Sequence, residues 1–309
     1  MEENHKINRV YFILIIGIIS VSFSAIFVKN TTAPSNIIAM YRMVITFLLF
    51  LPVTLITRWK EIKEIKLKDF LLCALSGGFM ALHFSTWITS LQYTTVASST
   101  VLVGLQPIFT AAIGYFLYQE RLNKVSIIGM LTAIAGSSIM GIFDFQLGSE
   151  HLYGDVLALL GGFFGALYII MGRGIRKRVS TVTYGFFVYG VCALLLVGIN
   201  VILKTPLIGY SQMDYALFLA MAVICTIGGH TIFNWSLRYI EANRVSTAML
   251  GEPVGATFLA IILLKEIPTL PQAISGVLIL TGLYIFMIAS VKEDKTRLNS
   301  ERIFTPSEL

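Results

Sequence analysis

The chain contains one segment that occurs twice. Residues 93–136 and 239–282 correspond in register, and the dipeptides Gln106-Pro107 and Glu252-Pro253 occupy the same place in the two copies. Each position of the first copy has its counterpart 146 positions later. The fold must therefore contain two similarly built halves.

The repeated segments belong to a chain that is too apolar for an ordinary soluble domain. Of its 309 residues, 56% are hydrophobic and only 13% are charged, and the mean hydropathy is +0.80. Stretches of about 18 to 24 apolar residues can cross a hydrocarbon core of about 30 Å. The sequence predicts an all-α membrane protein with ten transmembrane helices, over residues 10–28, 36–57, 70–91, 95–118, 124–143, 155–172, 182–203, 214–237, 245–264 and 271–291.

The two copies are separated by five spans. An odd number of crossings turns the second copy upside down in the membrane, so the spans form two inverted five-helix repeats, residues 1–143 and 155–291. Inverted repeats are typical of alternating-access transporters. Residues 292–309 are too polar to form a core, and we expect a disordered cytoplasmic tail there.

The basic residues are distributed unevenly. With a cytoplasmic N-terminus, nineteen of the 23 Lys and Arg residues lie on the cytoplasmic side, three lie outside, and Arg42 lies within a span. This is the positive-inside distribution, so the net charge of +6 indicates orientation and not nucleic-acid binding. We expect a multi-pass protein of the cell membrane with both termini in the cytoplasm.

One cytoplasmic segment mixes basic and apolar side chains. Residues 59–69 alternate Lys with Ile62, Ile65 and Leu67. The pattern fits a short interfacial helix on anionic lipid, or a solvated positive-inside loop. We favour the loop.

An ionisable side chain at membrane depth is a candidate for function, because a charge there costs roughly 2.5–3.5 kcal/mol on insertion scales. Glu252 is the sharpest candidate, since it lies inside the ninth span and Pro253 removes a backbone hydrogen bond beside it. Its carboxyl group either exchanges a proton during transport or holds the kink by bonding a neighbouring helix. Its counterpart Gln106 cannot titrate. The kinks at Pro107 and Pro253 are candidate gating points.

Two pairs of side chains share helical faces at a spacing of four residues. His83 and Trp87 lie in the third span, and His230 and Asn234 lie in the eighth. An imidazole beside an indole can stack on a ring or a cation. An interior histidine more commonly serves only packing, and both interpretations stay open.

Arg42 lies inside the second span and needs a counter-charge or a group of carbonyls there. Its guanidinium either binds a substrate carboxylate through two hydrogen bonds or braces the bundle, and bracing is slightly favoured. Tyr168 in the sixth span and Ser22 and Ser24 in the first are weaker hydrogen-bonding candidates.

Enzyme and cofactor motifs are absent from the sequence. The four histidines form no HExxH motif, and neither G-x-S-x-G nor a phosphate-binding glycine loop occurs. The three cysteines lie singly in separate spans, which fits neither a disulfide framework nor a metal-ligand spacing. We expect no enzyme activity, no metal and no cofactor.

The pattern resembles a known family of membrane proteins. Ten spans in a five-plus-five inverted repeat are combined with Leu105-Gln106-Pro107 and Gly251-Glu252-Pro253, and an acidic residue, Glu120 or Glu266, follows each at the end of the span. These features are similar to the EamA group of the drug/metabolite transporter superfamily. The resemblance covers nearly the whole chain.

The resemblance implies that spans one to four and six to nine surround a central cavity, with spans five and ten peripheral. It also implies transport of small metabolites such as amino acids or their derivatives, often outward. Gln106 departs from the Glu-Pro pattern, so a coupling role shared by both halves is not implied. The side chains that this placement brings toward the cavity are Arg42, His83, Trp87, Gln106, Tyr168, His230, Asn234 and Glu252.

We predict a secondary transporter in which Trp87 and His83 stack on the substrate, Arg42 binds a carboxylate, and Glu252 acts in proton coupling or gating. An uncoupled facilitator in the same fold is the main alternative, and a membrane-integral enzyme or a receptor-like scaffold is a remote one. The expected partners are a small-molecule substrate and membrane lipid. The sequence leaves the substrate, direction and coupling ion open, and admits a monomer or a homodimer.

Overall fold

The computed structural model describes residues 2–118, 123–176, 178–236 and 249–304, and every regular element in these ranges is a helix. The first half contains α1 (Glu2–Lys29), α2 (Ser35–Glu64), α3 (Leu67–Tyr93), α4 (Val96–Val103), α5 (Gln106–Tyr118) and α6 (Lys124–Leu147). The second half contains α7 (Ser149–Ile175), α8 (Thr181–Ile202), α9 (Gln212–Ala220), η1 (Met221–His230), α10 (Thr231–Ser236), α12 (Gly251–Leu259), η2 (Ala260–Leu264) and α13 (Leu270–Phe304). The helix α13 thus includes most of the segment 292–309, whose last five residues lie outside the described part.

The helices have the lengths that a membrane requires. Within the described ranges, nine helical stretches of at least 18 residues are apolar enough to cross a bilayer. The fourth of them joins α4 and α5, and the eighth joins α9, η1 and α10. A further apolar stretch, Gly251–Leu264, is shorter, and residues 245–248 of the predicted ninth span lie outside the described residues.

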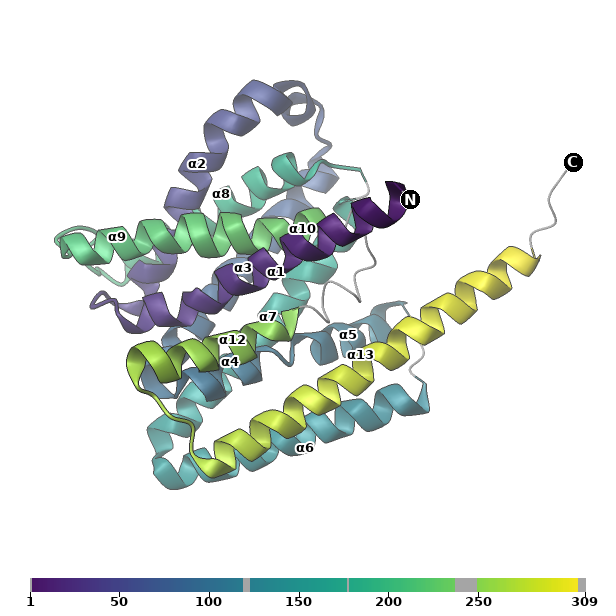
Figure 1. Cartoon of the computed structure of the whole chain (residues 1–309). Coiled ribbons are helices and arrows are strands. Elements are labelled where there is room, and N and C mark those ends of the chain that lie inside the picture. Colours follow the sequence, from purple (N-terminus) through teal and green to yellow (C-terminus); the bar gives the residue numbers. More distant parts are fainter. Residues whose placement is uncertain (1, 119–122, 177, 237–248, 305–309) are drawn as a thin grey trace, which may run out of the picture.

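The helices pack in pairs that take one member from each half of the chain. The pairs are α2 with α8, α3 with α7, α1 with η1, and α6 with α13. The fourth and ninth spans follow the same rule, since α4 contacts α7 and α12 contacts α1. Figure 1 shows α6 and α13 side by side at one edge of the bundle, and the start of α1 and the end of α13 on the same side. The two halves therefore interlock and do not form separate lobes.

Small residues let α6 and α13 approach backbone to backbone. A Cβ atom on Gly129 would lie 2.5 Å from the backbone nitrogen of Phe286, and one on Gly282 would lie 2.5 Å from the backbone nitrogen of Ala133. No side chain fits at these distances, which is the reason for glycine here. We call this contact, made by Gly129, Ala133 and Gly282, the glycine seam.

The fourth and ninth spans are interrupted at equivalent places. A turn at Gly104 and Leu105 separates α4 from α5, just before Pro107. A turn at Leu250 precedes α12, just before Pro253. A Cβ atom on Gly104 would lie 3.5 Å from Cγ of Pro253, so the two interruptions meet inside the bundle.

The segment between the two predicted repeats, residues 144–154, is helical except at one glycine. Gly148 has a φ of 143°, which side chains rarely tolerate, and it turns α6 directly into α7. Asp144 at the end of α6 is fully buried and accepts hydrogen bonds from Ser98 at 2.7 Å and from Gln272 at 2.8 Å. Asp144 thereby ties the end of α6 to α4 and α13.

Candidate functional site

Arg42 on α2 lies at the centre of a polar cluster. Its side chain is fully buried. Its Nε donates a hydrogen bond to Oγ1 of Thr226 on η1 at 2.8 Å, and its Nη1 donates to Oγ of Ser24 on α1 at 2.9 Å. The guanidinium carbon lies 4.3 Å from the centroid of the Phe84 ring on α3. Arg42 therefore joins α1, α2, α3 and η1.

The charge of Arg42 is only partly compensated. Its Nη2 has no hydrogen-bond partner among the residues that the structure describes. Glu252 on α12 is close enough to interact electrostatically, but no ion pair joins the two within the described part of the chain. An unpaired buried charge is costly, and a guanidinium with a free N–H group readily binds an anion. Glu252 keeps some accessible surface.

Aromatic rings surround the Phe84 side of this cluster. The ring of His230 on η1 meets Phe84 edge to face at a centroid distance of 5.9 Å, and the rings of His83 and Trp87 are parallel within 8° at 6.3 Å. The Nδ1 of His83 lies 2.8 Å from the carbonyl oxygen of Gly161 on α7. Because a carbonyl oxygen only accepts, Nδ1 carries the hydrogen in the neutral ring.

Trp87 is 4% exposed, and its Nε1 donor has no partner within the described part of the chain. Its backbone side packs against α7, where a Cβ atom on Gly161 would lie 3.1 Å from Cβ of Trp87. A buried indole N–H normally finds an acceptor. Trp87 thus leaves a second unused donor, besides Nη2 of Arg42, in this part of the interior.

Gln106 at the start of α5 reaches the same region from the first repeat. A Cβ atom on Gly165 of α7 would lie 2.5 Å from Oε1 of Gln106 and 3.1 Å from Nδ1 of His83. Only glycine leaves room for the amide and the imidazole together. Gln106 is therefore packed closely beside His83, whereas the equivalent Glu252 lies near Arg42.

Tyr168 and Asn234 form a second polar cluster. Nδ2 of Asn234 on α10 donates to the hydroxyl of Tyr168 on α7 at 3.3 Å, and Nη1 of Arg176 donates to Oδ1 of Asn234 at 3.0 Å. The hydroxyl of Tyr189 on α8 lies 3.4 Å from Oγ1 of Thr231 and interacts electrostatically with both Tyr168 and Arg42. Tyr189 connects the two clusters.

A family model decides what kind of protein carries this arrangement. The model of the EamA-like transporter family matches residues 8–142 and again residues 152–288. The chain belongs to the EamA-like transporter family. The family is built from two repeats of five helices, which confirms the predicted fold class. The match also confirms the predicted family and the general class of membrane transporter.

Curated relatives carry transporter names. A "Probable amino-acid metabolite efflux pump" of Escherichia coli is 26% identical over 278 residues, which cover 86% of this chain and 81% of the relative. A protein of the same name from Salmonella typhimurium is 28% identical over 228 residues, 70% of each chain. An "Uncharacterized transporter" of Clostridium kluyveri is 25% identical over 290 residues, 86% of this chain and 91% of the relative.

A solved structure shares the fold of this EamA-like transporter. It superposes with a TM-score of 0.63 at 17% sequence identity, and the match covers 91% of this chain and 98% of the other. At that identity the likeness concerns the fold alone.

Several residues of the candidate site were not among the sequence candidates. Phe84, Thr226, Tyr189 and Arg176 all contact or interact with predicted site residues. Thr226 could have been found as a polar side chain at membrane depth. Phe84 gave no such signal, because its role depends on Arg42 lying over its ring.

Metal-ligating side chains are not grouped in the described part of this transporter. No three His, Cys, Asp or Glu residues within it could share an ion. Cys73, Cys192 and Cys225 are buried free thiols on α3, α8 and η1.

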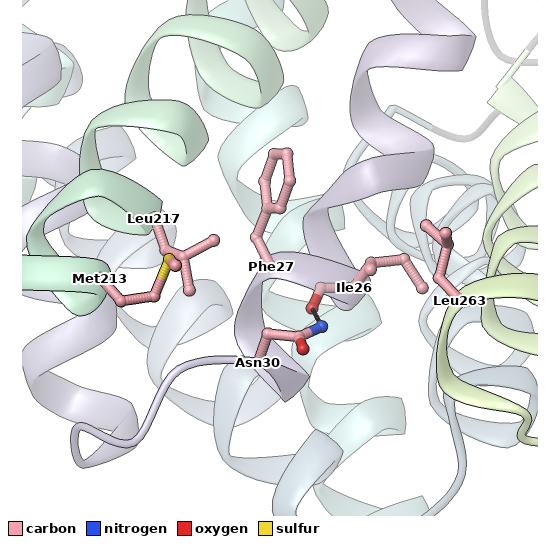
Figure 2. A pocket seen from close by; sticks show the side chains of 6 residues that line it. All are labelled: Ile26, Phe27, Asn30, Met213, Leu217 and Leu263. Carbon is pink, nitrogen blue, oxygen red and sulfur yellow. Dashed lines mark hydrogen bonds between the residues drawn. The ribbon is translucent and has the colours of Figure 1, made fainter.

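A pocket of about 390 Å³ opens between the end of α1, the start of α9 and the end of η2 (Figure 2). Asn30 is its polar lining residue, and its Nδ2 is already bonded to the backbone oxygen of Ile26 at 2.9 Å. The pocket contains none of the predicted site residues. Its other lining residues are Ile26, Phe27, Met213, Leu217 and Leu263.

Proposed function

We propose that this EamA-like protein is a secondary transporter that exports a small amino-acid-like metabolite across the cell membrane by alternating access. The observation that carries the proposal is the buried Arg42, whose Nη2 donor is bonded to none of the described residues and lies beside an aromatic cluster. A carboxylate is the natural ligand of such a guanidinium. The export names of the Escherichia coli and Salmonella typhimurium relatives support the substrate class and the direction.

The rings beside Arg42 are suited to the remainder of such a substrate. His83 and Trp87 present parallel rings, and Trp87 adds an unused buried N–H donor. An aromatic or cationic group can stack there. A substrate with a carboxylate at one end and a ring or ammonium group at the other would satisfy both parts.

Glu252 supplies the proposed coupling. It lacks a direct partner among the described residues, yet lies within electrostatic reach of Arg42. A substrate carboxylate bound to Arg42 would change the electric field at Glu252, so substrate binding and proton binding would be linked.

The interlocked repeats, residues 1–143 and 155–291, would supply the movement. The largest contacts between the halves occur as exchanged pairs, as in α1 with η1 and α7 with α3. Breaking one set of contacts while forming the other would open the site on alternate sides of the membrane. The uneven distribution of basic residues supports cytoplasmic termini. So does the position of the start of α1 and the end of α13 on the same side of the bundle (Figure 1).

The test is transport in proteoliposomes. We expect saturable counterflow of one or more amino acids from a panel that includes aromatic ones, with accumulation driven by an imposed pH gradient. In Glu252→Gln, counterflow should persist while the pH gradient no longer drives accumulation. The matched control is Glu150→Gln, since Glu150 is an exposed acid at the start of α7.

Two results would contradict the proposal. Absence of saturable counterflow for every carboxylate-bearing substrate would exclude the substrate class. An unchanged response of Glu252→Gln to the pH gradient would exclude the coupling role and favour an uncoupled facilitator.

A further inference from the structure

The helix α2 continues beyond a kink near its C-terminal end. Arg58 has non-helical angles, φ −133° and ψ 16°, and the helix resumes through Glu64 before α3 begins at Leu67. We call residues 58–71 the basic corner. The sequence favoured a solvated loop for residues 59–69, whereas the structure places them in helix except at Ile65 and Lys66.

The cations of the basic corner all point outward. Glu64 is the exposed carboxylate among them. A surface with five cations against one anion attracts negatively charged groups. The exposed cations are Arg58, Lys60, Lys63, Lys66 and Lys68.

The other two acids of the basic corner are turned inward. Glu61 accepts hydrogen bonds from the backbone N–H of Ser180 at 2.6 Å, from its hydroxyl at 2.7 Å and from the hydroxyl of Thr183 at 2.8 Å. Asp69 is 7% exposed and lies 2.6 Å from Nη2 of Arg178. Neither acid is free to neutralise the lysines, and both tie the corner to the start of α8.

Large apolar side chains are exposed among the cations. Trp59 is 49% exposed, Leu67 71% and Leu71 56%. Nζ of Lys63 lies 5.0 Å from the Trp59 ring centroid. Exposed rings and leucines next to lysines suit the boundary between acyl chains and headgroups.

We propose that the basic corner binds the phosphate headgroups of anionic phospholipids in the cytoplasmic leaflet. The lysines contact the headgroups, and Trp59, Leu67 and Leu71 lie at the acyl boundary. Because Glu61 and Asp69 fix the corner to α8, a bound lipid stabilises the packing of α2, α3 and α8. If these charges served only to orient the protein in the membrane, their number alone would matter. The inward-facing acids and the exposed apolar side chains would then have no role.

The test compares lipids added to the purified full chain in detergent. Phosphatidylglycerol should raise the apparent Tm more than phosphatidylcholine with the same acyl chains, and salt should weaken this difference. In Lys63→Gln/Lys66→Gln the phosphatidylglycerol concentration for half the shift should rise roughly tenfold or more. Lys63→Arg/Lys66→Arg should keep the shift, as should the control Lys204→Gln/Lys265→Gln, which alters exposed lysines in other loops.

Three outcomes would overturn the proposal. The first is an equal shift with both lipids, and the second is an unchanged phosphatidylglycerol response in Lys63→Gln/Lys66→Gln. The third is an equal shift with soluble glycerol phosphate, which would assign the corner to a soluble anion. All variants alter exposed side chains, so a loss of the lipid response in folded protein is separable from misfolding.

Discussion

The glycine seam and the Arg42 cluster are both buried, but they are built on opposite principles. At the seam, α6 and α13 meet through Gly129 and Gly282 with backbone atoms in contact, so the packing is complete. Around Arg42, two donors, Nη2 and the indole Nε1 of Trp87, find no acceptor among the described residues. Complete packing fixes the two helices in one position relative to each other. Hydrogen-bond donors without an acceptor can instead bind a ligand. The seam is therefore a scaffold, and the cluster is where binding and movement are expected.

The largest effect is expected at the seam. Gly129→Leu would push a side chain into the backbone of α13 and cost about 3 kcal/mol, the upper end of typical overpacking penalties. The apparent Tm in detergent measures the loss. The control is Gly141→Leu on the same helix, because a Cβ atom there meets only Cδ1 of Leu152 at 3.7 Å. Equal Tm values for the two variants would mean that the seam is not rigid.

A smaller effect on stability, and a larger one on binding, is expected at Arg42. In Arg42→Lys a single ammonium cannot reach both Ser24 and Thr226, and the free N–H of the fork is lost. We expect a loss of about 1.5–3 kcal/mol in stability and roughly tenfold weaker binding of a carboxylate substrate. The substrate-induced rise in Tm reports the binding.

The control for Arg42 is Thr226→Val, which removes the acceptor of Nε and keeps the guanidinium. It should cost about 1 kcal/mol without a comparable loss of substrate affinity. If Arg42→Lys lowered the Tm but bound substrate as the parent does, Arg42 would only brace the bundle.

The smallest effect is expected when the carboxyl group is moved to the first repeat. In Gln106→Glu/Glu252→Gln the new carboxyl lies beside His83 and Gly165, whereas the carboxyl of Glu252 interacts directly with the charge of Arg42. We expect counterflow within about threefold of Glu252→Gln alone, equivalent to about 0.6 kcal/mol or less, and no recovery of the pH-gradient response. Recovery of that response would show that a carboxyl group in either repeat can couple transport to protons.

Much of the fold could be predicted from the sequence. Long apolar runs must span the membrane as helices because their backbone groups cannot bond to lipid, and the 146-residue repeat reports two similar halves. The interruption of the fourth span beside Pro107 also follows from local chemistry, since proline lacks a backbone donor. The candidate list already contained Arg42, Glu252, His83 and Trp87 as costly or unusual groups at membrane depth.

The partners of those groups could not be predicted. Lipid is as apolar as the protein interior, so a span is apolar on every side and its sequence does not say which face turns inward. Phe84 under Arg42, Gly104 against Pro253 and Glu61 against Ser180 each depend on how helices distant in the chain rotate and cross. The sequence by itself determined the number of spans, their repetition and the polar groups within them. Only the tertiary structure decided which groups meet, because close packing between helices sets those contacts.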